Sequence, residues 1–426
     1  MQILKEKEGF GPELIAQLKK RSNKATAQIE SSVSEIIAKV REEGDRAVAE
    51  YTKKFDGSVP ETIELSKEQM ISLAAQCGEE FLGALHRAAQ NIREFHERQK
   101  QQSWFETREN GVMLGQRIRG LSRVGIYVPG GTAAYPSSVL MNAIPAKIAG
   151  VGEIIMATPP SKDGKPNPAI MAAAVEAGVD RVFQVGGAQA IAAMAFGTET
   201  IPAVDKIVGP GNIFVATAKK QLYGTVGIDM VAGPSEILIL ADETANPKFL
   251  AADLMSQAEH DVLASAILLT TSEKIAEETL KELERQKSSL ERKDIITQSL
   301  DNFGAIVVCS SMDEAVNFAN ELAPEHLEIC TENPMDYIGR IDNAGSVFLG
   351  HYAPEPLGDY YAGPNHVLPT GGTARFFSPL SVDSFVKKSS FLYYTKEALA
   401  EAQEDIITLA NAEGLTAHAN SIKVRE

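Results

Sequence analysis

The stretch Arg123-Val-Gly-Ile-Tyr-Val-Pro-Gly-Gly131 runs from an apolar segment directly into a glycine-rich turn. This is typical of a buried strand that leads into a helix. The same rhythm continues toward residue 222 and predicts strands at 123–128, 153–158, 181–185 and 206–208, alternating with helices at 137–149, 168–177, 188–195 and 212–222. Strands that alternate with helices in this way form parallel sheets through right-handed crossovers.

A second series of the same kind follows residue 236. It predicts strands at 237–241, 264–270, 305–309 and 346–349, and helices at 247–260, 273–290 and 312–323. The apolar spacing is helical at 32–55, 67–76 and 78–102 and again in the tail at 396–413. We therefore expect an α/β protein with two tandem doubly wound, incomplete Rossmann-like parallel-sheet domains, a helical N-terminal segment and a small helical C-terminal tail.

Composition excludes several classes of protein. The 426 residues carry a net charge of −16, which disfavours a nucleic-acid partner or an anionic membrane partner. The apolar runs are of strand length, and the first residues lack the apolar stretch of a signal peptide. The three cysteines, Cys77, Cys309 and Cys330, have no paired spacing, so we expect a cytoplasmic protein without disulfides.

Three glycine-rich loops follow predicted strands of the first series: Val128-Pro-Gly-Gly131, Val185-Gly-Gly-Ala-Gln189 and Val208-Gly-Pro-Gly-Asn212. Such loops direct backbone N–H groups and a helix N-terminus toward an anionic ligand. Turn formation and helix capping are the alternative interpretation, especially for Asn212. The G-x-G-x-x-G fingerprint is absent, so the pattern alone does not identify the cofactor.

Polar residues that could carry chemistry are concentrated later in the chain. Four groups stand out: Gln257 with His260, Glu325 with His326, Asp359 with His366, and Glu413 with His418. Nitrogen and oxygen donors without thiolates suit zinc, although the spacing between the groups does not test this. An adjacent carboxyl and imidazole also suit two separate proton transfers. Each histidine taken singly is more often structural.

Longer motifs give a more specific indication. The chain resembles the histidinol dehydrogenase family from about residue 25 onward, and the resemblance rests on RVGIYVPGG at 123–131, VAGPSE at 231–236, SQAEH at 256–260, APEHL at 323–327, Gly358-Asp359 and GPNHVLPTGGTAR at 363–375. The resemblance implies oxidation of L-histidinol through an aldehyde to L-histidine, in two NAD-linked steps that end L-histidine biosynthesis.

The resemblance also implies roles for individual residues. It implies one zinc ion per subunit, replaceable by Mn²⁺, with the ligands Gln257, His260, Asp359 and His418. Glu325 and His326 would form the acid/base pair, and NAD would contact Tyr127, Gln189 and Asn212. The substrate would contact the metal ligands together with Ser235, His326 and Glu413.

The expected domain organisation follows the same resemblance. We expect an N-terminal helical arm at 1–24 and a first, discontinuous domain at 25–126 plus 237–380 that carries the metal and catalytic residues. A second domain at 127–236 would bind NAD, and a dimerisation tail at 381–426 would dock on the partner. The tail carries Glu413 and His418, so a homodimer with shared active sites is expected.

Three alternatives remain open at this stage. A member of the same family could oxidise another small alcohol. Cys330 or Cys309 could form a thiohemiacetal with the aldehyde, although both residues lie in apolar contexts typical of core thiols. A metal- or nucleotide-binding module without turnover would leave the Glu325–His326 pair unexplained.

Overall fold

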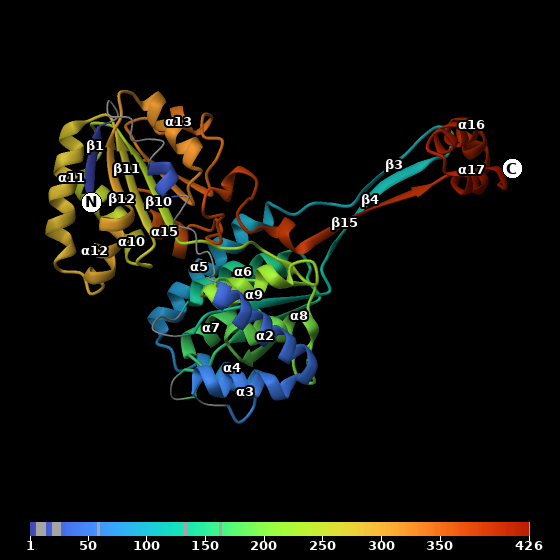
Figure 1. The fold of residues 1–426 in the computed structure, drawn as a ribbon, viewed down its shortest axis with the longest axis horizontal. Helices are drawn as coiled ribbons and strands as arrows, with labels where there is room; N and C mark the ends of the chain where they lie inside the picture. Colours follow the sequence, from blue (N-terminus) through green and yellow to red (C-terminus); the bar gives the residue numbers. More distant parts are fainter. Residues whose placement is uncertain (6–13, 19–26, 58–59, 131–134, 162–163, 426) are drawn as a thin grey trace.

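The computed structural model describes residues 1–5, 14–18, 27–57, 60–130, 135–161 and 164–425. These residues form two lobes, each built on a six-stranded sheet, and an arm that projects from the body (Figure 1). The expected turn at Gly131 lies outside the described residues. The same is true of residues 6–13 and 19–24 of the expected helical arm.

We call the first lobe the glycine-loop lobe because its sheet leads into the three glycine-rich loops. Its sheet has the order β2-β7-β6-β5-β8-β9. The strands are β2 (Glu64–Leu65), β5 (Arg123–Tyr127), β6 (Glu153–Thr158), β7 (Arg181–Gln184), β8 (Lys206–Val208) and β9 (Gly227–Ile228). All pairings are parallel except the one between β2 and β7.

Helices cover both faces of this sheet. One face packs against α2 (Ala27–Glu43), α3 (Asp45–Asp56), α8 (Gly187–Phe196) and α9 (Ile213–Leu222). The other face packs against α4 (Lys67–Ala74), α5 (Glu79–Glu97), α6 (Pro136–Ile148) and α7 (Pro168–Ala177). The strands are buried on both sides, as expected for a parallel sheet between two helical layers.

We call the second lobe the histidine lobe. Its sheet has the order β1-β12-β11-β10-β13-β14 and is entirely parallel. The strands are β1 (Gln2–Lys5), β10 (Glu236–Ala241), β11 (Ser265–Thr270), β12 (Gly304–Val308), β13 (His326–Cys330) and β14 (Ser346–Leu349). The helices are α10 (Pro247–Ala258), α11 (Glu273–Lys287), α12 (Lys293–Phe303), α13 (Met312–Leu322), α14 (Met335–Ile338) and α15 (Glu355–Tyr360).

The two sheets have equivalent strand orders. If the strands of each lobe are numbered along the chain, with β5 or β10 as strand 1, both sheets have the spatial order 3-2-1-4-5. Each sheet has one extra strand beside strand 3, which is β2 in one lobe and β1 in the other. This is the order of the doubly wound dinucleotide-binding folds without their sixth strand. The predicted fold class is confirmed, and the shared order supports an origin by duplication.

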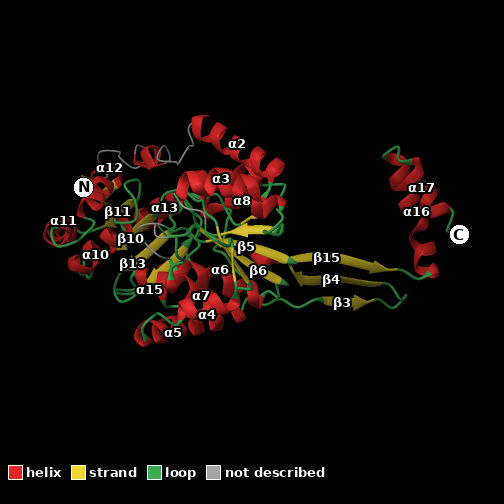
Figure 2. Cartoon of the chain, turned by 90° about the horizontal axis from the view of Figure 1, so that it is seen from below, coloured by secondary structure: helices red, strands yellow, loops and turns green. Residues whose placement is uncertain are grey.

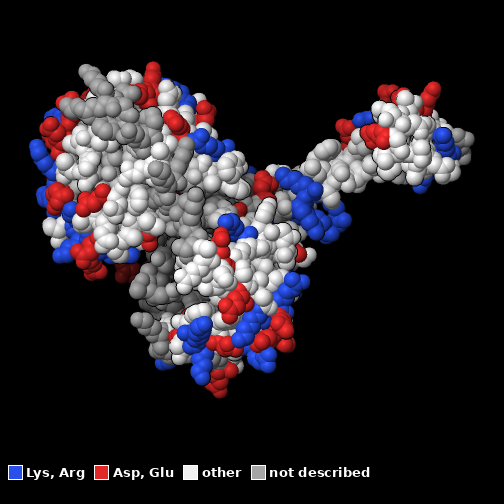
Figure 3. All heavy atoms as spheres, in the orientation of Figure 1, with Lys and Arg blue, Asp and Glu red and all other residues white. Residues whose placement is uncertain are grey.

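The arm was not predicted. It consists of β3 (Trp104–Thr107), β4 (Met113–Gly120) and β15 (Val386–Tyr393), which form an antiparallel sheet. Helices α16 (Lys396–Ala412) and α17 (Thr416–Lys423) lie at its far end (Figure 2). Lys and Arg side chains gather where the arm leaves the body (Figure 3), and there Arg119 of β4 pairs across the strands with Lys387 of β15.

Two parts of the expected organisation differ from the structure. Residues 25–126 were expected to join 237–380, but α2 to α5 and β5 pack on the sheet of the glycine-loop lobe. The apolar spacing of a helix shows that one face is buried but does not show which sheet it covers. The N-terminal segment was expected to be helical. Residues 14–18 are helical, but Gln2–Lys5 pairs with β12 as the edge strand of the histidine lobe.

Candidate active site

The predicted acid/base pair lies at the amino-terminal edge of the histidine-lobe sheet. His326 begins β13, which pairs with the neighbouring strand β10, and Glu325 precedes it. The backbone N–H of Glu236 donates to Glu325 Oε2 at 2.9 Å, and His326 Nδ1 lies 3.0 Å from the carbonyl oxygen of Glu236. A carbonyl only accepts, so Nδ1 carries the hydrogen and Nε2 keeps its lone pair. One residue of β10 therefore orients both members of the pair.

The free Nε2 atom of His326 faces a group of carboxyl side chains. It lies 3.9 Å from Glu355 Oε1 and 3.9 Å from Asp359 Oδ1, and ligand atoms of these three residues all lie within 4.8 Å of one another. Within the described part of the chain, buried His326 Nε2 and buried Gln257 Oε1 have no hydrogen-bond partner. Buried polar atoms without partners are costly, and a bound cation or ligand would satisfy them.

Short helices position these groups. Gln257 lies in the last turn of α10 and His260 lies just beyond it, where His260 Nδ1 contacts the Ser256 carbonyl at 3.0 Å. Glu355 and Asp359 are four residues apart on α15 and therefore share a face of that helix. Ser256 Oγ donates to Glu355 Oε2 at 3.1 Å and joins the two helices.

The glycine-loop lobe also reaches this site. His366 Nδ1 lies 3.0 Å from the carbonyl oxygen of Asp359, and Ser138 Oγ of α6 lies 3.4 Å from His366 Nε2. Ser235, which precedes β10, accepts the backbone N–H of Ser265 at the same sheet edge. The two lobes therefore meet beside the predicted acid/base pair.

Burial dominates the electrostatics of the cluster. It lowers the pKa values of His326 and His366 to about 4, so both imidazoles are neutral near pH 7. Burial, followed by the charges of neighbouring acids, raises the pKa of Glu325 well above its usual value and that of Glu355 to about 8. Burial also raises the pKa of Asp359 to about 6. Several buried acids that disfavour their charged forms make an environment suited to a divalent cation.

Two predicted site residues are not brought to this cluster by their own chain. Glu413, at the end of α16, and His418, in α17, are exposed at the far end of the arm (Figure 1). Of the remaining predicted metal ligands, Gln257 lies on α10, His260 just beyond it, and Asp359 on the adjoining α15.

The residues predicted to contact NAD meet at the carboxyl edge of the other sheet. The Gly187 N–H donates to the Tyr127 hydroxyl at 3.1 Å, and burial raises the pKa of that hydroxyl to about 12. Neither side-chain polar atom of buried Gln189 has a hydrogen-bond partner among the described residues. Asn212 Oδ1 caps α9 by accepting N–H groups of Phe214 and Val215, and this residue is exposed. Capping therefore uses the oxygen of Asn212 and leaves its amide nitrogen for other partners.

The chain is similar to known proteins in both sequence and fold. A family profile described as histidinol dehydrogenase matches residues 19–426. The chain belongs to the histidinol dehydrogenase family. It is 59% identical to histidinol dehydrogenase of Clostridium acetobutylicum over 97% of this chain and 96% of the relative. The crystal structure of histidinol dehydrogenase from Elizabethkingia anophelis matches with a TM-score of 0.90 and 43% identity, covering 94% of this chain and 93% of that one. The resemblance noted in the motifs is confirmed.

Membership in the histidinol dehydrogenase family makes the chain an NAD-linked oxidoreductase of histidine biosynthesis that acts on a CH–OH group. Every helix among the described residues is too short or too polar to span a bilayer. The thiols do not resemble catalytic groups. Cys309 and Cys330 are buried, and burial raises the pKa of Cys309 to about 11 and that of Cys330 further. A thiohemiacetal mechanism would need an accessible thiolate.

Sequence reasoning missed Glu355 as a member of the site and gave His366 no role. The i, i+4 spacing between Glu355 and Asp359 was the available signal, but a six-residue helix inside a Gly/Pro-rich stretch has too few residues for periodicity to be recognised. His366 was noted only as a neighbour of Asp359 in sequence, and its contact with α6 depends on the approach of the two lobes.

Proposed function

We propose that the chain oxidises L-histidinol to L-histidine through the aldehyde, in two NAD-linked steps supported by a bound zinc ion. The observation that carries this proposal is buried His326 Nε2, which has no hydrogen-bond partner in the part of the chain that the structure describes and lies 3.9 Å from carboxyl oxygens of Glu355 and Asp359 on α15. A hydride-transfer site needs a base without a hydrogen-bond partner of its own, beside a group that orients the alcohol.

The donor set fits zinc. Gln257, His260 and Asp359 would bind it, and His418 from a second copy of the chain would complete the set. When bound, the metal would act as a Lewis acid that holds the imidazole and amine of histidinol. Ser235 and Glu413 would contact the substrate. Manganese would be an acceptable substitute because the set has no thiolate.

His326 would serve as the base in both oxidations. Its Nδ1–H bond to the Glu236 carbonyl fixes the tautomer and directs Nε2 toward the substrate. Burial keeps the imidazole neutral near pH 7, because its pKa is lowered to about 4. His326 Nε2 would accept the hydroxyl proton of histidinol first and a proton of the hydrated aldehyde later.

Glu325 would act between the two oxidations. The aldehyde must add water before it can be oxidised again, and Glu325 would take the proton from that water. The carboxyl is held by the Glu236 N–H at 2.9 Å, and burial raises its pKa well above the usual value. A carboxyl with a raised pKa can both accept and return a proton near neutral pH.

NAD would accept the hydride at the carboxyl edge of the glycine-loop lobe. The position supports this because β5 and β8 flank the point where the strand order reverses, which is where open α/β sheets bind ligands. Tyr127 and Gln189 lie there, and Asn212 caps the helix that starts from the same edge.

We also propose a cytoplasmic homodimer in which each tail completes the site of the partner. The arm supports this proposal because it exposes apolar side chains on both faces, including Trp104, Phe105, Phe391 and Leu392. A three-stranded sheet with two exposed apolar faces is expected to be covered by another surface.

The direct test follows absorbance at 340 nm after L-histidinol and NAD are added to purified protein. Two NADH should form for each L-histidinol consumed, and L-histidine should be the product. Release of one NADH with accumulation of an aldehyde would contradict the four-electron reaction. Turnover of other small amino alcohols, but not of histidinol, would point to a different substrate.

A further inference from the structure

A buried ion pair in the glycine-loop lobe has no role in the reaction described above. Lys219 lies on α9 and Asp229 follows β9, and their side chains are only 4% and 2% exposed. Lys219 Nζ donates to the Gly209 carbonyl at 2.9 Å, while the Gly209 N–H donates to Asp229 Oδ2 at 2.8 Å. The pair therefore holds both polar groups of one glycine.

Gly209 cannot be replaced or moved easily. Its φ is +110°, which favours glycine, and a Cβ there would lie 2.1 Å from the Tyr127 carbonyl oxygen. The residue begins the loop Val208-Gly-Pro-Gly-Asn212 at the reversal between β5 and β8. A small displacement of Gly209 would shift this loop, the N-terminus of α9 and Asn212 together.

The energetics favour a positioning role over a stabilising one. Removing two charges from water costs several kcal/mol per ion, so a buried pair contributes little net stability compared with apolar side chains of similar size. The geometry of the pair is specific, because Asp229 Oδ1 also accepts the Met230 N–H at 2.7 Å. Groups that fix a ligand-binding loop through such contacts maintain its geometry in the absence of the ligand.

Asp229 also begins the segment that crosses to the histidine lobe. The Gly233 N–H in this segment donates to Thr370 Oγ1 at 2.6 Å, and the segment ends at Glu236, which orients Glu325 and His326. The Thr370 contact holds the part of the segment that leads to the acid/base pair, so a change at Asp229 should act on the glycine loop.

We propose that the Lys219–Asp229 ion pair positions the Gly209 loop for NAD. This inference rests on the proposed function, since it assumes that NAD binds at this edge. The pair acts through the Gly209 backbone and does not touch the dinucleotide. Loss of the pair should therefore weaken NAD binding and leave the metal site and the binding of histidinol unchanged.

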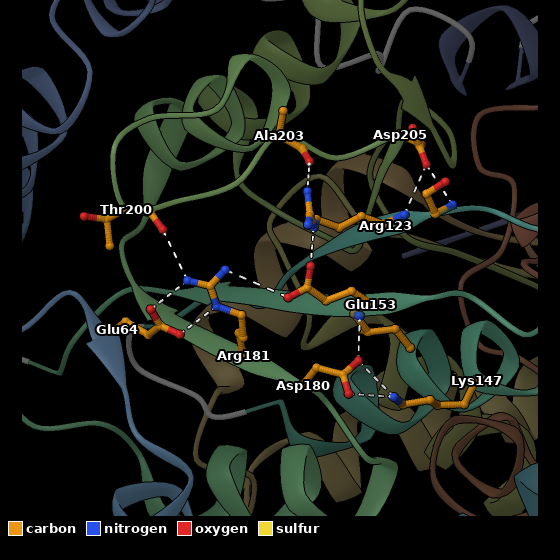
Figure 4. A network of polar contacts seen from close by, with 11 residues as sticks. Glu64, Arg123, Lys147, Glu153, Asp180, Arg181, Thr200, Ala203 and Asp205 are labelled. Atoms are coloured by element: carbon orange, nitrogen blue, oxygen red, sulfur yellow. Dashed lines mark hydrogen bonds and ion pairs between the residues drawn. The ribbon is translucent and has the colours of Figure 1, made fainter.

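Another set of ion pairs in the same lobe provides a matched control (Figure 4). It lies at the opposite, amino-terminal edge of the sheet, where Arg123, Glu153 and Arg181 begin their strands. Lys147 donates to both carboxylate oxygens of Asp180 at 2.9 Å in this network. Neutralising that pair removes two opposite charges from the lobe without contact with the glycine loops.

The test compares the double variant Lys219→Met/Asp229→Asn with the control Lys147→Met/Asp180→Asn. Both changes keep side-chain size and remove one positive and one negative charge together. Calorimetric titration of the zinc-loaded protein with NAD should show a Kd raised about tenfold in the first variant, comparable to the loss of one hydrogen bond to a charged group. The control should keep the wild-type Kd. Zinc content, far-UV circular dichroism and the KM for histidinol should be unchanged in both.

Two further variants keep the inference open to refutation. Asp229→Asn alone is isosteric and serves if the double variant accumulates poorly, and Lys219→Arg retains a donor and should recover most of the NAD affinity. Folded variants that bind NAD like the wild type, or an equal loss in the control, would overturn the positioning role. If the wild-type chain bound no NAD, the proposed cofactor itself would be wrong, and the inference would be wrong with it.

Discussion

The two lobes share a strand order but carry their candidate site residues at opposite edges of their sheets. In the glycine-loop lobe, Tyr127 and the loop after Val208 lie at the carboxyl ends of β5 and β8. In the histidine lobe, Glu236 and His326 lie at the amino ends of β10 and β13, the equivalent strands. The equivalent topology therefore does not determine which edge of a sheet becomes a reaction site.

Local residues explain the difference. The carboxyl end of β10 leads into Asp242-Glu-Thr244, without glycine. Asp242 Oδ2 accepts the Glu332 N–H at 3.1 Å and thereby bridges the reversal point between β10 and β13, and Asp242 Oδ1 accepts the Thr244 N–H. Acidic side chains that occupy backbone N–H groups disfavour a phosphate-bearing ligand there. The carboxyl edge of the histidine-lobe sheet, which is the edge that binds dinucleotides in doubly wound folds, is therefore unfavourable for such a ligand.

The largest expected effect comes from removing the proposed zinc ion, which should affect only the histidine-lobe edge. Chelation should abolish turnover, while far-UV circular dichroism remains native because apolar cores on both faces of the histidine-lobe sheet hold that lobe together without the ion. Added Zn²⁺ or Mn²⁺ should restore activity. Unfolding on chelation would show that the metal holds the histidine lobe together and does not act only at one edge of its sheet.

Replacing Glu325 or His326 should reduce activity, whereas a change at the opposite edge of the same sheet should not. His326→Asn should reduce both oxidation steps by roughly 10²–10⁴-fold, the range for a positioned base, and Glu325→Gln should slow the overall reaction more than aldehyde formation. The matched control is His351→Asn, because His351 lies near Thr244 at the opposite edge. Single-turnover measurements with histidinol and with the aldehyde distinguish the steps. Equal damage from Cys330→Ala would favour a thiohemiacetal instead.

A mixed-chain experiment tests whether the arm supplies the missing part of the histidine-lobe site. His418→Ala and His326→Asn chains, each nearly inactive, are unfolded, mixed and refolded together. Random pairing makes half of the dimers mixed, and one of the two sites in each mixed dimer is intact, so about a quarter of wild-type activity should return. No recovery would mean that each chain completes its own site.

The smallest expected effect concerns pH and the stability of the metal-free protein. An unfolded histidine has a pKa near 6.5, whereas buried His326 has one of about 4. Between these values the unfolded chain binds a proton that the folded chain does not, so stability falls as pH drops through this window. His326→Asn removes this contribution, and its stability should depend less on pH, by up to about 1.4 kcal/mol per pH unit. Urea unfolding at several pH values measures the slope. His86→Asn, which replaces a 65% exposed side chain, is the control for the loss of a histidine at the surface.

The sequence by itself determined the type of most elements and the family to which the chain belongs. Alternating apolar strands and amphipathic helices predicted both parallel sheets, since periodicity reports which local conformation buries an apolar face. The motifs around Gln257, Glu325 and Asp359 were sufficient to identify the family, because side chains that perform chemistry must be of particular types.

Only the tertiary structure decided how distant segments combine. Helices α2 to α5 cover the sheet of the glycine-loop lobe, which β2 and β5 help to form, while Gln2–Lys5 completes the sheet of the other lobe. Strands β3, β4 and β15 form an arm from segments far apart in the chain, and Glu355 joins His326 and Asp359 at a sheet edge. Local periodicity shows that a face must be buried, but the surface that buries it is selected by contacts over the whole chain, which no short window of sequence contains.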